Sequence, residues 1–149
     1  MGLITGDKAP SFSSKDEKGN SIQLSDFQGK KLVLYFYPKD DTSGCTAQAC
    51  NLRDSLPALS AAGYQIIGVS VDDEKSHLKF IAKYELNFPL IADTDHQLVE
   101  AYGVWKEKSM YGKKYMGTVR TTFVIDEQGT IINIIDKVKT AEHAAQILD

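Results

Sequence analysis

The two cysteines of this 149-residue chain, Cys45 and Cys50, lie five positions apart in the stretch PKDDTSGCTAQAC. A deprotonated cysteine can act as a nucleophile, bind a metal or form a disulfide. Pro38, Thr42 and Gly44 precede the first cysteine. Thr42 can donate and accept a hydrogen bond, Gly44 permits close approach to the backbone, and Pro38 packs without adding a donor. The stretch therefore combines the residue types that a reactive thiol and a small substrate need.

Two simpler interpretations of the cysteines compete with redox chemistry. Both could be small buried hydrophobic residues of one helix, because free cysteine is often buried. A zinc site would need four ligands at short local spacings, and the chain has no second cysteine pair. The histidines, which we expect at the surface or at helix caps, fall on three separate predicted helices: His77, His96 and His143. A metal site is therefore disfavoured, whereas an inert pair stays open.

The position of Cys45 favours redox chemistry. We predict a helix that begins at Thr42 or Ser43, with either hydroxyl as its cap. Cys45 then falls in the first turn, where unpaired N–H groups and the helix dipole stabilise a thiolate. The spacing C-x-x-x-x-C differs from the C-x-x-C of disulfide exchangers. In this third interpretation Cys45 attacks an oxidant, and Cys50 condenses with the oxidised product.

Apolar runs and turn residues predict the elements that hold this stretch. The run KLVLYFY, residues 31–37, ends at Pro38 and is typical of a central strand buried on both faces. The helix that follows should break near Asp54, because the proline at position 57 is tolerated only in a first helical turn. Asp54 would then cap a second segment that ends at Gly63. Such a break would limit any unwinding to the part of the helix that carries the cysteines.

The other predicted elements alternate along the chain. Strands are expected at 64–71, 87–93, 121–126 and 130–136, the last two forming a hairpin. Helices are expected at 73–86, after a Thr94 or Asp95 cap, and after a Thr140 cap. Residues 104–120 should form a loop or ribbon, and an N-terminal β-hairpin should turn at 18–20. This order predicts an α/β, thioredoxin-like fold in one domain, 1–149, whose mixed central sheet has helices on both faces.

Composition disfavours several classes of partner. With 42% hydrophobic and 25% charged residues, a net charge of −3 and a pI near 5.6, the chain should bury an ordinary core. It should have no bulk attraction to nucleic acid or to anionic membranes. The first residues, MGLITGDKAPSF, lack the pattern of a secretory signal, and no apolar run approaches the ~18 residues of a membrane span. We therefore expect a cytoplasmic protein, in which a permanent structural disulfide is not expected.

The residues around Cys45 match a known motif. The pattern Pro38-x-x-x-Thr42-x-x-Cys45 resembles the peroxidatic motif of the peroxiredoxins. Cys50, five residues later, resembles the second cysteine of their bacterioferritin comigratory protein, or Q-type, subfamily. The similarity extends through GDKAPSF, LVLYFYPKDDT, YGVW and VRTTFVIDEQG. In such proteins an arginine just before the late hairpin completes the site, and Arg120 occupies that place.

The resemblance implies a function and a set of residue roles. Cys45 would reduce hydrogen peroxide or organic hydroperoxides and become a sulfenic acid, which Cys50 would resolve as an intramolecular disulfide. Thr42 and Arg120 would be catalytic, and the substrate would be bound by Pro38, Thr42, Gly44 and Arg120. Thioredoxin or a similar dithiol would recycle the protein, with no metal and no organic cofactor, and we expect a monomer. A thiol–disulfide oxidoreductase and a non-enzymatic redox-switch binding module remain alternatives.

Four neighbours of Cys45 carry further expectations. Ser43 stands where many relatives have proline, and it should still serve at a helix start. Gln48 stands where many have glutamate, so hydrogen bonding that depends on a carboxylate would be lost. Asp40 and Asp41 would disfavour a thiolate if they faced it. We therefore expect both of these side chains to point to solvent.

Overall fold

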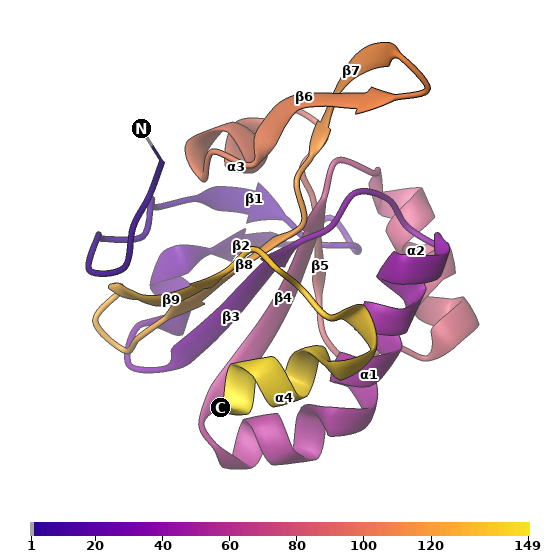
Figure 1. Cartoon of the computed structure of the whole chain (residues 1–149). Coiled ribbons are helices and arrows are strands. Elements are labelled where there is room, and N and C mark those ends of the chain that lie inside the picture. Colours follow the sequence, from indigo (N-terminus) through magenta and orange to yellow (C-terminus); the bar gives the residue numbers. More distant parts are fainter. Residues whose placement is uncertain (1) are drawn as a thin grey trace.

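The computed structural model describes residues 2–149 and centres on a five-stranded sheet with the order β5-β4-β3-β8-β9 (Figure 1). Its strands are β3 (Lys31–Phe36), β4 (Tyr64–Ser70), β5 (Leu90–Ala92), β8 (Thr121–Ile125) and β9 (Ile131–Ile135). β3 runs parallel to β4, which runs parallel to β5, whereas β8 is antiparallel to both of its neighbours. The sheet is therefore mixed, as the sequence predicts.

The central strand β3 is buried on both faces. Successive side chains of a strand point to opposite faces of the sheet. Leu34 and Phe36 accordingly join one hydrophobic core, whereas Val33 and Tyr35 join the other. Because β3 is held between β4 and β8, the end of this strand is a fixed point from which the cysteine-bearing segment starts.

Helices cover both faces of the sheet (Figure 1). The helices α1 (Ser43–Ala61), α2 (Glu74–Tyr84) and α4 (His143–Leu148) contribute to the core that contains Val33. α3 (Gln97–Ala101) contributes to the opposite core, and two short 3-10 helices, η1 (Leu24–Phe27) and η2 (Thr140–Glu142), complete the helical elements. None of the helices in the described residues is both long and apolar enough to cross a lipid bilayer.

Two antiparallel ribbons lie outside the central sheet. β1 (Ser13–Lys15) pairs with β2 (Ser21–Gln23), which confirms the N-terminal hairpin. β6 (Trp105–Met110) pairs with β7 (Lys113–Thr118), so the segment 104–120 forms a ribbon (Figure 1). The ring of Trp105 lies 4.3 Å from the ring of His96, between centroids, and this contact attaches the start of the ribbon to α3.

The helix with the cysteines is longer than the sequence predicts. α1 is continuous over 19 residues and includes Pro57, so the break expected near Asp54 is wrong. A proline lacks the N–H that would bond to the carbonyl four residues earlier, which here is that of Arg53. The side-chain amide of Asn87 donates to this carbonyl instead, at 3.2 Å. Because the freed carbonyl has a partner distant in sequence, the helix continues to Ala61.

Two other helix starts differ from the expected caps. Neither Thr94 nor Asp95 is the N-cap of α3, a position that His96 occupies. The buried carboxylate of Asp93 accepts hydrogen bonds from two N–H groups of the first turn of α3. These bonds replace the water that a buried carboxylate cannot reach. Thr140 begins the 3-10 helix η2 and makes no cap hydrogen bond.

Candidate active site

Cys45 is the third residue of α1 and lies in its first turn, as the sequence predicts. Its side chain is buried, whereas that of Cys50 is half-buried, and both thiols are free. The first N–H groups of a helix have no acceptor within the helix. No side chain caps α1, so these groups stay available to an anion or a substrate. The position therefore places the Cys45 sulfur beside N–H groups that can donate to an anionic sulfur or to a bound substrate.

Arg120 contacts the sulfur of Cys45. Its Nη2 donates to Cys45 Sγ at 3.3 Å. Arg120 directly precedes β8, and the register of β8 with β3 sets Thr121 opposite Phe36. The arginine therefore lies at the end of the sheet from which the chain enters α1. A cation this close can donate a hydrogen bond to the sulfur and attract negative charge that develops beside it.

Gln48 holds the guanidinium of Arg120 in place. This side chain is fully buried one turn after Cys45, and its Oε1 accepts a hydrogen bond from Arg120 Nη1 at 2.7 Å. The hydrogen bonding expected to depend on a carboxylate is thus made by a neutral amide. Among the described residues, Gln48 Nε2 has no hydrogen-bond partner. Because the amide carries no charge, it does not neutralise the cation beside the sulfur.

The absence of a side chain at Gly44 leaves room for Arg120. A Cβ at this position would lie 3.2 Å from Arg120 Nη2, which is tighter than nine in ten real Cβ contacts. Any larger residue would push the guanidinium away from Cys45. The sequence predicts close approach to the backbone at Gly44, and in the structure the group that approaches is the guanidinium of Arg120.

The loop between β3 and α1 carries Pro38 and Thr42. Pro38 is half-buried directly after the buried Tyr37, and Thr42 is the exposed N-cap residue of α1. The prediction that the hydroxyl of Thr42 or Ser43 caps the helix is wrong, because no side chain caps α1 and Thr42 Oγ1 donates instead to the carbonyl of Lys39 at 2.9 Å. The only hydrogen of this hydroxyl is committed there, so the oxygen retains lone pairs that can accept a hydrogen bond.

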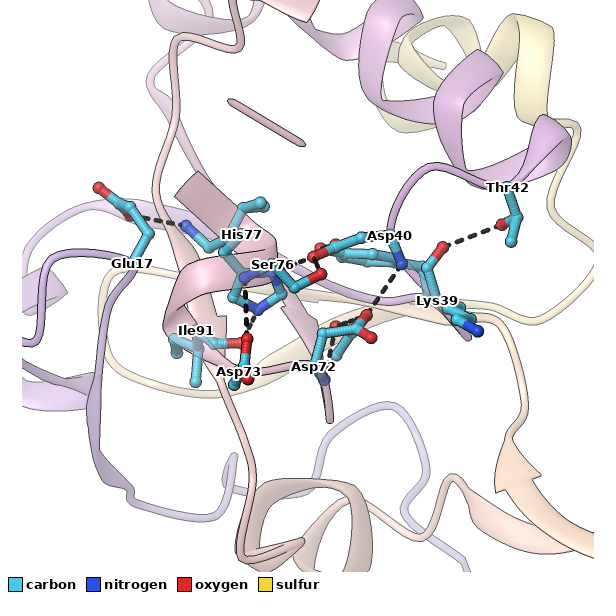
Figure 2. Close-up of polar contacts among 12 residues, drawn as sticks. Glu17, Lys39, Asp40, Thr42, Asp72, Asp73, Ser76, His77 and Ile91 are labelled. Atoms are coloured by element: carbon cyan, nitrogen blue, oxygen red, sulfur yellow. Dashed lines mark hydrogen bonds and ion pairs between the residues drawn. The ribbon is translucent and has the colours of Figure 1, made fainter. Parts of the chain in front are cut away.

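The two aspartates of this loop point in different directions. Asp41 is exposed and accepts hydrogen bonds from Lys83 and Tyr84 in the last turn of α2. The expectation that Asp40 points to solvent is wrong, because its side chain is buried. Figure 2 shows that it lies among polar residues of α2 and of the loop after β4. These neighbours supply the hydrogen bonds that make burial of a carboxylate tolerable.

Two of the three histidines are buried, which corrects the expectation that all lie at the surface or at caps. His77 and His143 have no exposed surface, whereas His96 is half-buried at the start of α3. The ring of His143 is hydrogen-bonded to Thr122 at 2.8 Å and to Gln146 at 2.9 Å. Burial lowers the pKa of His143.

Aromatic side chains form the apolar surroundings of Cys45. Tyr35 stacks on Tyr37 with 5.4 Å between ring centroids, and both belong to the core that includes Cys45. Burial, with a further contribution from Cys45, raises the pKa of Tyr35 well above its usual value, so its hydroxyl stays protonated. A Cβ at Gly68 would lie 2.9 Å from that hydroxyl oxygen, so β4 needs glycine there.

The polar network around Asp40 was not predicted from the sequence. Two of its members, Ser76 and His77, lie more than 35 positions from Asp40, and no local pattern links them to it. A topological signal was present, because Ser76 follows a strand parallel to β3. Loops after neighbouring parallel strands meet at one edge of a sheet.

The chain is similar to known proteins over nearly its whole length. The AhpC/TSA family model matches residues 5–134. A putative peroxiredoxin bcp of Coxiella burnetii is 47% identical over 99% of this chain and 98% of its own. Peroxiredoxin Bcp of Bacillus subtilis is 47% identical over 99% of this chain and 94% of its own. Both similarities include the segment with the cysteines.

Solved structures agree with the sequence comparisons. A cysteine-to-serine mutant of PrxQ from Xylella fastidiosa superposes with a TM-score of 0.93 at 34% identity, covering 99% of this chain and 94% of that one. Peroxiredoxin Q of Xanthomonas campestris gives a TM-score of 0.86 at 42% identity, covering 92% of this chain and 87% of that one. The fold is therefore thioredoxin-like.

A thioredoxin-like fold with a buried thiol at a helix N-terminus beside an arginine defines a class, the thiol-dependent peroxidases. Within that class, the chain belongs to the AhpC/TSA family of peroxiredoxins, and its relatives are of the Bcp, or Q, type.

Proposed function

We propose that Cys45 is the nucleophile of this peroxidase. Its thiolate attacks the terminal oxygen of a hydroperoxide, so that an S–O bond forms as the O–O bond breaks. The leaving RO⁻ takes a proton and departs as an alcohol, or as water when the substrate is hydrogen peroxide. Cys45 is left as a sulfenic acid. The observation that carries the proposal is the 3.3 Å contact between Arg120 Nη2 and Cys45 Sγ at the uncapped start of α1.

Arg120 and Thr42 bind the hydroperoxide in this proposal. Arg120 and the free N–H groups at the start of α1 donate to the peroxide oxygens, where negative charge develops as the O–O bond breaks. The Thr42 oxygen accepts the proton end of the ROOH group, because its own hydrogen is held by Lys39 O. Pro38 bounds the substrate site on the side of the loop between β3 and α1 without adding a donor. Gly44 leaves space for the guanidinium of Arg120.

Cys50 resolves the sulfenic acid. Its thiol attacks the oxidised sulfur of Cys45, which forms an intramolecular disulfide and releases water. Residues five apart in an α-helix are separated by ~7.5 Å along the axis and by ~140° around it. A disulfide needs Cα atoms ~4.4–6.8 Å apart with converging Cβ vectors. The first turns of α1 must therefore unwind after oxidation, which also exposes the disulfide to a reductant.

The finer assignments are also proposals. Organic hydroperoxides are included as substrates because a bacterioferritin comigratory protein of Xanthomonas campestris was solved in a trapped intermediate/ligand complex addressing alkyl peroxide reduction. We propose thioredoxin or a similar dithiol protein as the reductant, acting in the cytoplasm, where such dithiols are kept reduced. An intramolecular disulfide needs no second subunit, which is consistent with a monomer.

Thiol counting and intact mass test the proposal. Anaerobically reduced protein is mixed with one equivalent of hydrogen peroxide. We expect the wild type to lose both thiols and two hydrogen atoms, and Cys50→Ser to gain one oxygen atom. Cys45→Ser should consume no peroxide when thioredoxin and its reductase are present. Peroxide consumption by Cys45→Ser, or a disulfide found only between chains, would contradict the assignment. Insulin reduction without peroxidase activity would instead support a disulfide oxidoreductase.

A further inference from the structure

Asp40 is buried in a hydrogen-bond network that joins the active-site loop to the rest of the fold (Figure 2). Its Oδ1 accepts from the Tyr37 hydroxyl at 2.6 Å. Its Oδ2 accepts from Ser76 Oγ at 2.8 Å and lies 2.7 Å from His77 Nδ1. The carboxylate therefore connects the loop after β3 with the first turn of α2.

The peptide unit between Lys39 and Asp40 links this network to Thr42. The N–H of Asp40 donates to Asp72 Oδ2 at 2.8 Å, and Asp72 is itself held by Ser70 Oγ at 2.7 Å. The carbonyl of the same peptide, that of Lys39, accepts the Thr42 hydroxyl at 2.9 Å. Figure 2 shows these bonds on both sides of the loop. A rotation of the peptide would break both bonds, so the orientation of the Thr42 hydroxyl depends on how firmly Asp40 is held.

His77 holds Asp40 from within the core. Its Nε2 lies 2.9 Å from the carbonyl oxygen of Ile91, which can only accept, so Nε2 carries a hydrogen. Burial by itself lowers the pKa of His77, but the hydrogen bond and charge of Asp40, together with the Ile91 carbonyl and the charge of Asp72, outweigh it, so the pKa is raised overall. The ionisable groups facing the ring are Asp40 from the loop, Asp72 after β4 and Tyr37 after β3. A protonated ring can donate to Asp40 and to Ile91 at once.

A metal ion is a weaker explanation of this cluster. One ligand atom each from Asp40, Asp72 and His77 lies within 4.8 Å of the others. A cation bound there would have to displace the hydrogen bonds that Asp40 already accepts and the one that its N–H donates. The contacts are those of a satisfied hydrogen-bond network.

We propose that His77 and Asp40 are positioning residues for peroxide reduction, which fix the 38–42 loop so that the Thr42 oxygen faces the hydroperoxide. This inference rests on the role proposed for Thr42. Neither residue contacts Cys45 or the substrate. Their substitution should therefore slow the reaction with peroxide while the reactivity of the thiolate toward other electrophiles is retained.

The ratio of two rate constants measures this effect. One is the oxidation of Cys45 by hydrogen peroxide, followed by stopped-flow fluorescence, and the other is its alkylation by iodoacetamide at the same pH. A change in the thiolate fraction alters both constants equally, whereas a misplaced Thr42 lowers only the first. Misplacement of a catalytic group by about 1 Å can cost ~10²-fold. We expect the ratio to fall about tenfold or more when the contact between His77 and Asp40 is lost.

Two substitutions of His77 distinguish a positioning role in the reaction from a purely structural role. The side-chain amide of asparagine can replace Nδ1, so His77→Asn keeps a donor to Asp40 and loses the contact to Ile91. The longer His77→Gln reaches toward Ile91 and loses the contact to Asp40. We expect His77→Asn to keep a ratio close to wild type and His77→Gln to lower it. Equal effects of the two substitutions would overturn the proposal, because a structural role does not depend on which bond remains.

A double-mutant cycle with Thr42 tests whether His77 acts on the reaction through the Thr42 hydroxyl. In a Thr42→Val background, which lacks the hydroxyl, His77→Gln should lower the ratio no further. A further loss would overturn the proposal. A Thr42→Val ratio equal to wild type would instead show that the proposed role of Thr42 is wrong, while the nucleophile assignment would stand.

The neighbouring residue and a milder change complete the controls. Asp41→Asn weakens the exposed contacts of the same loop with Lys83 and Tyr84 in the last turn of α2, and it should leave the ratio unchanged. If His77→Gln does not fold, Ser76→Ala removes one donor to Asp40 while its N–H remains in the helix cap. An unchanged ratio for Ser76→Ala would then overturn the proposal.

Discussion

Gln48 Oε1 accepts a hydrogen bond from Arg120 Nη1 at 2.7 Å, although 72 positions separate the two residues. The bond leaves Nη2 of the same guanidinium directed at Cys45 Sγ, at 3.3 Å. A planar guanidinium fixed at one nitrogen has little freedom to rotate at the other. Gln48 thus orients the cation and, being neutral, does not compete for its charge.

Arg120→Ala should slow the oxidation of Cys45 by hydrogen peroxide by ~10²–10³-fold, because it removes a donor aimed at developing charge. Gln48→Ala should slow it less, since Arg120 remains but is no longer oriented. Stopped-flow fluorescence under single-turnover conditions measures both rates, and circular dichroism checks that the fold is intact. A wild-type rate for Arg120→Ala would remove this residue from the proposed site.

Oxidation should expose only a short part of α1. The N–H of Ala144 donates to Asn51 Oδ1 at 2.8 Å, and Arg53 Nη1 donates to the carbonyl of Tyr84 at 2.6 Å. These ties hold the helix from residue 51 onward, so we expect hydrogen-exchange protection to be lost at about 46–50. Mass spectrometry of reduced and disulfide-bonded protein measures it. Equal protection in both states would contradict local unwinding.

Substitution of Asn51 tests whether its hydrogen bond to Ala144 limits the unwinding of α1. Asn51→Ala should let the loss of protection extend further along α1 in the oxidised protein, while the reduced protein keeps its helix. The central strands β3 and β4 should be equally protected in every sample. The prediction fails if the boundary stays at the same residue in Asn51→Ala.

Asn87→Ala should lower the free energy of unfolding by ~0.5–1.5 kcal/mol, toward the low end because Asn87 is exposed. The substitution leaves the Arg53 carbonyl without its partner. In a Pro57→Ala background the restored N–H can take that carbonyl, so Asn87→Ala should cost less. Urea denaturation of the four proteins gives the coupling energy. Strictly additive effects would show that Asn87 does not compensate for the proline.

His77 should make stability fall as pH rises above about 6.5, the ordinary pKa of histidine. Its folded-state pKa is raised, so its contribution is complete below the unfolded value and is lost as pH rises through the folded value. His143 has a lowered pKa and acts in the opposite sense, below about 6.5. The two effects therefore occupy different pH ranges.

Urea denaturation of wild type and His77→Asn from pH 7 to 9 isolates this contribution. The stability difference between the two proteins should shrink as pH rises, because other groups titrate alike in both. A constant difference would show that the ring of His77 does not titrate in this range.

The strands and the position of Cys45 at a helix start could be predicted from the sequence because both depend on neighbours along the chain. The run from Lys31 to Tyr37 is apolar over a whole strand, and Cys45 follows a helix-starting Thr42 by three positions. Only the family motif identifies Arg120, since a lone arginine has no local pattern that would assign it a role. The pairing of β8 with β3 is what brings it to Cys45.

The continuity of α1 and the burial of Asp40 were decided by tertiary structure. Pro57 would end an isolated helix, but Asn87 supplies a donor to the carbonyl that proline frees. Asp40 would be exposed in an isolated loop, but His77 and Ser76 satisfy its carboxylate. A buried polar group is stable only with a partner, and here the partners lie 30 or more positions away. The residue type determines which hydrogen bonds and which chemistry are available, whereas a partner distant in the sequence determines whether the polar group can be buried.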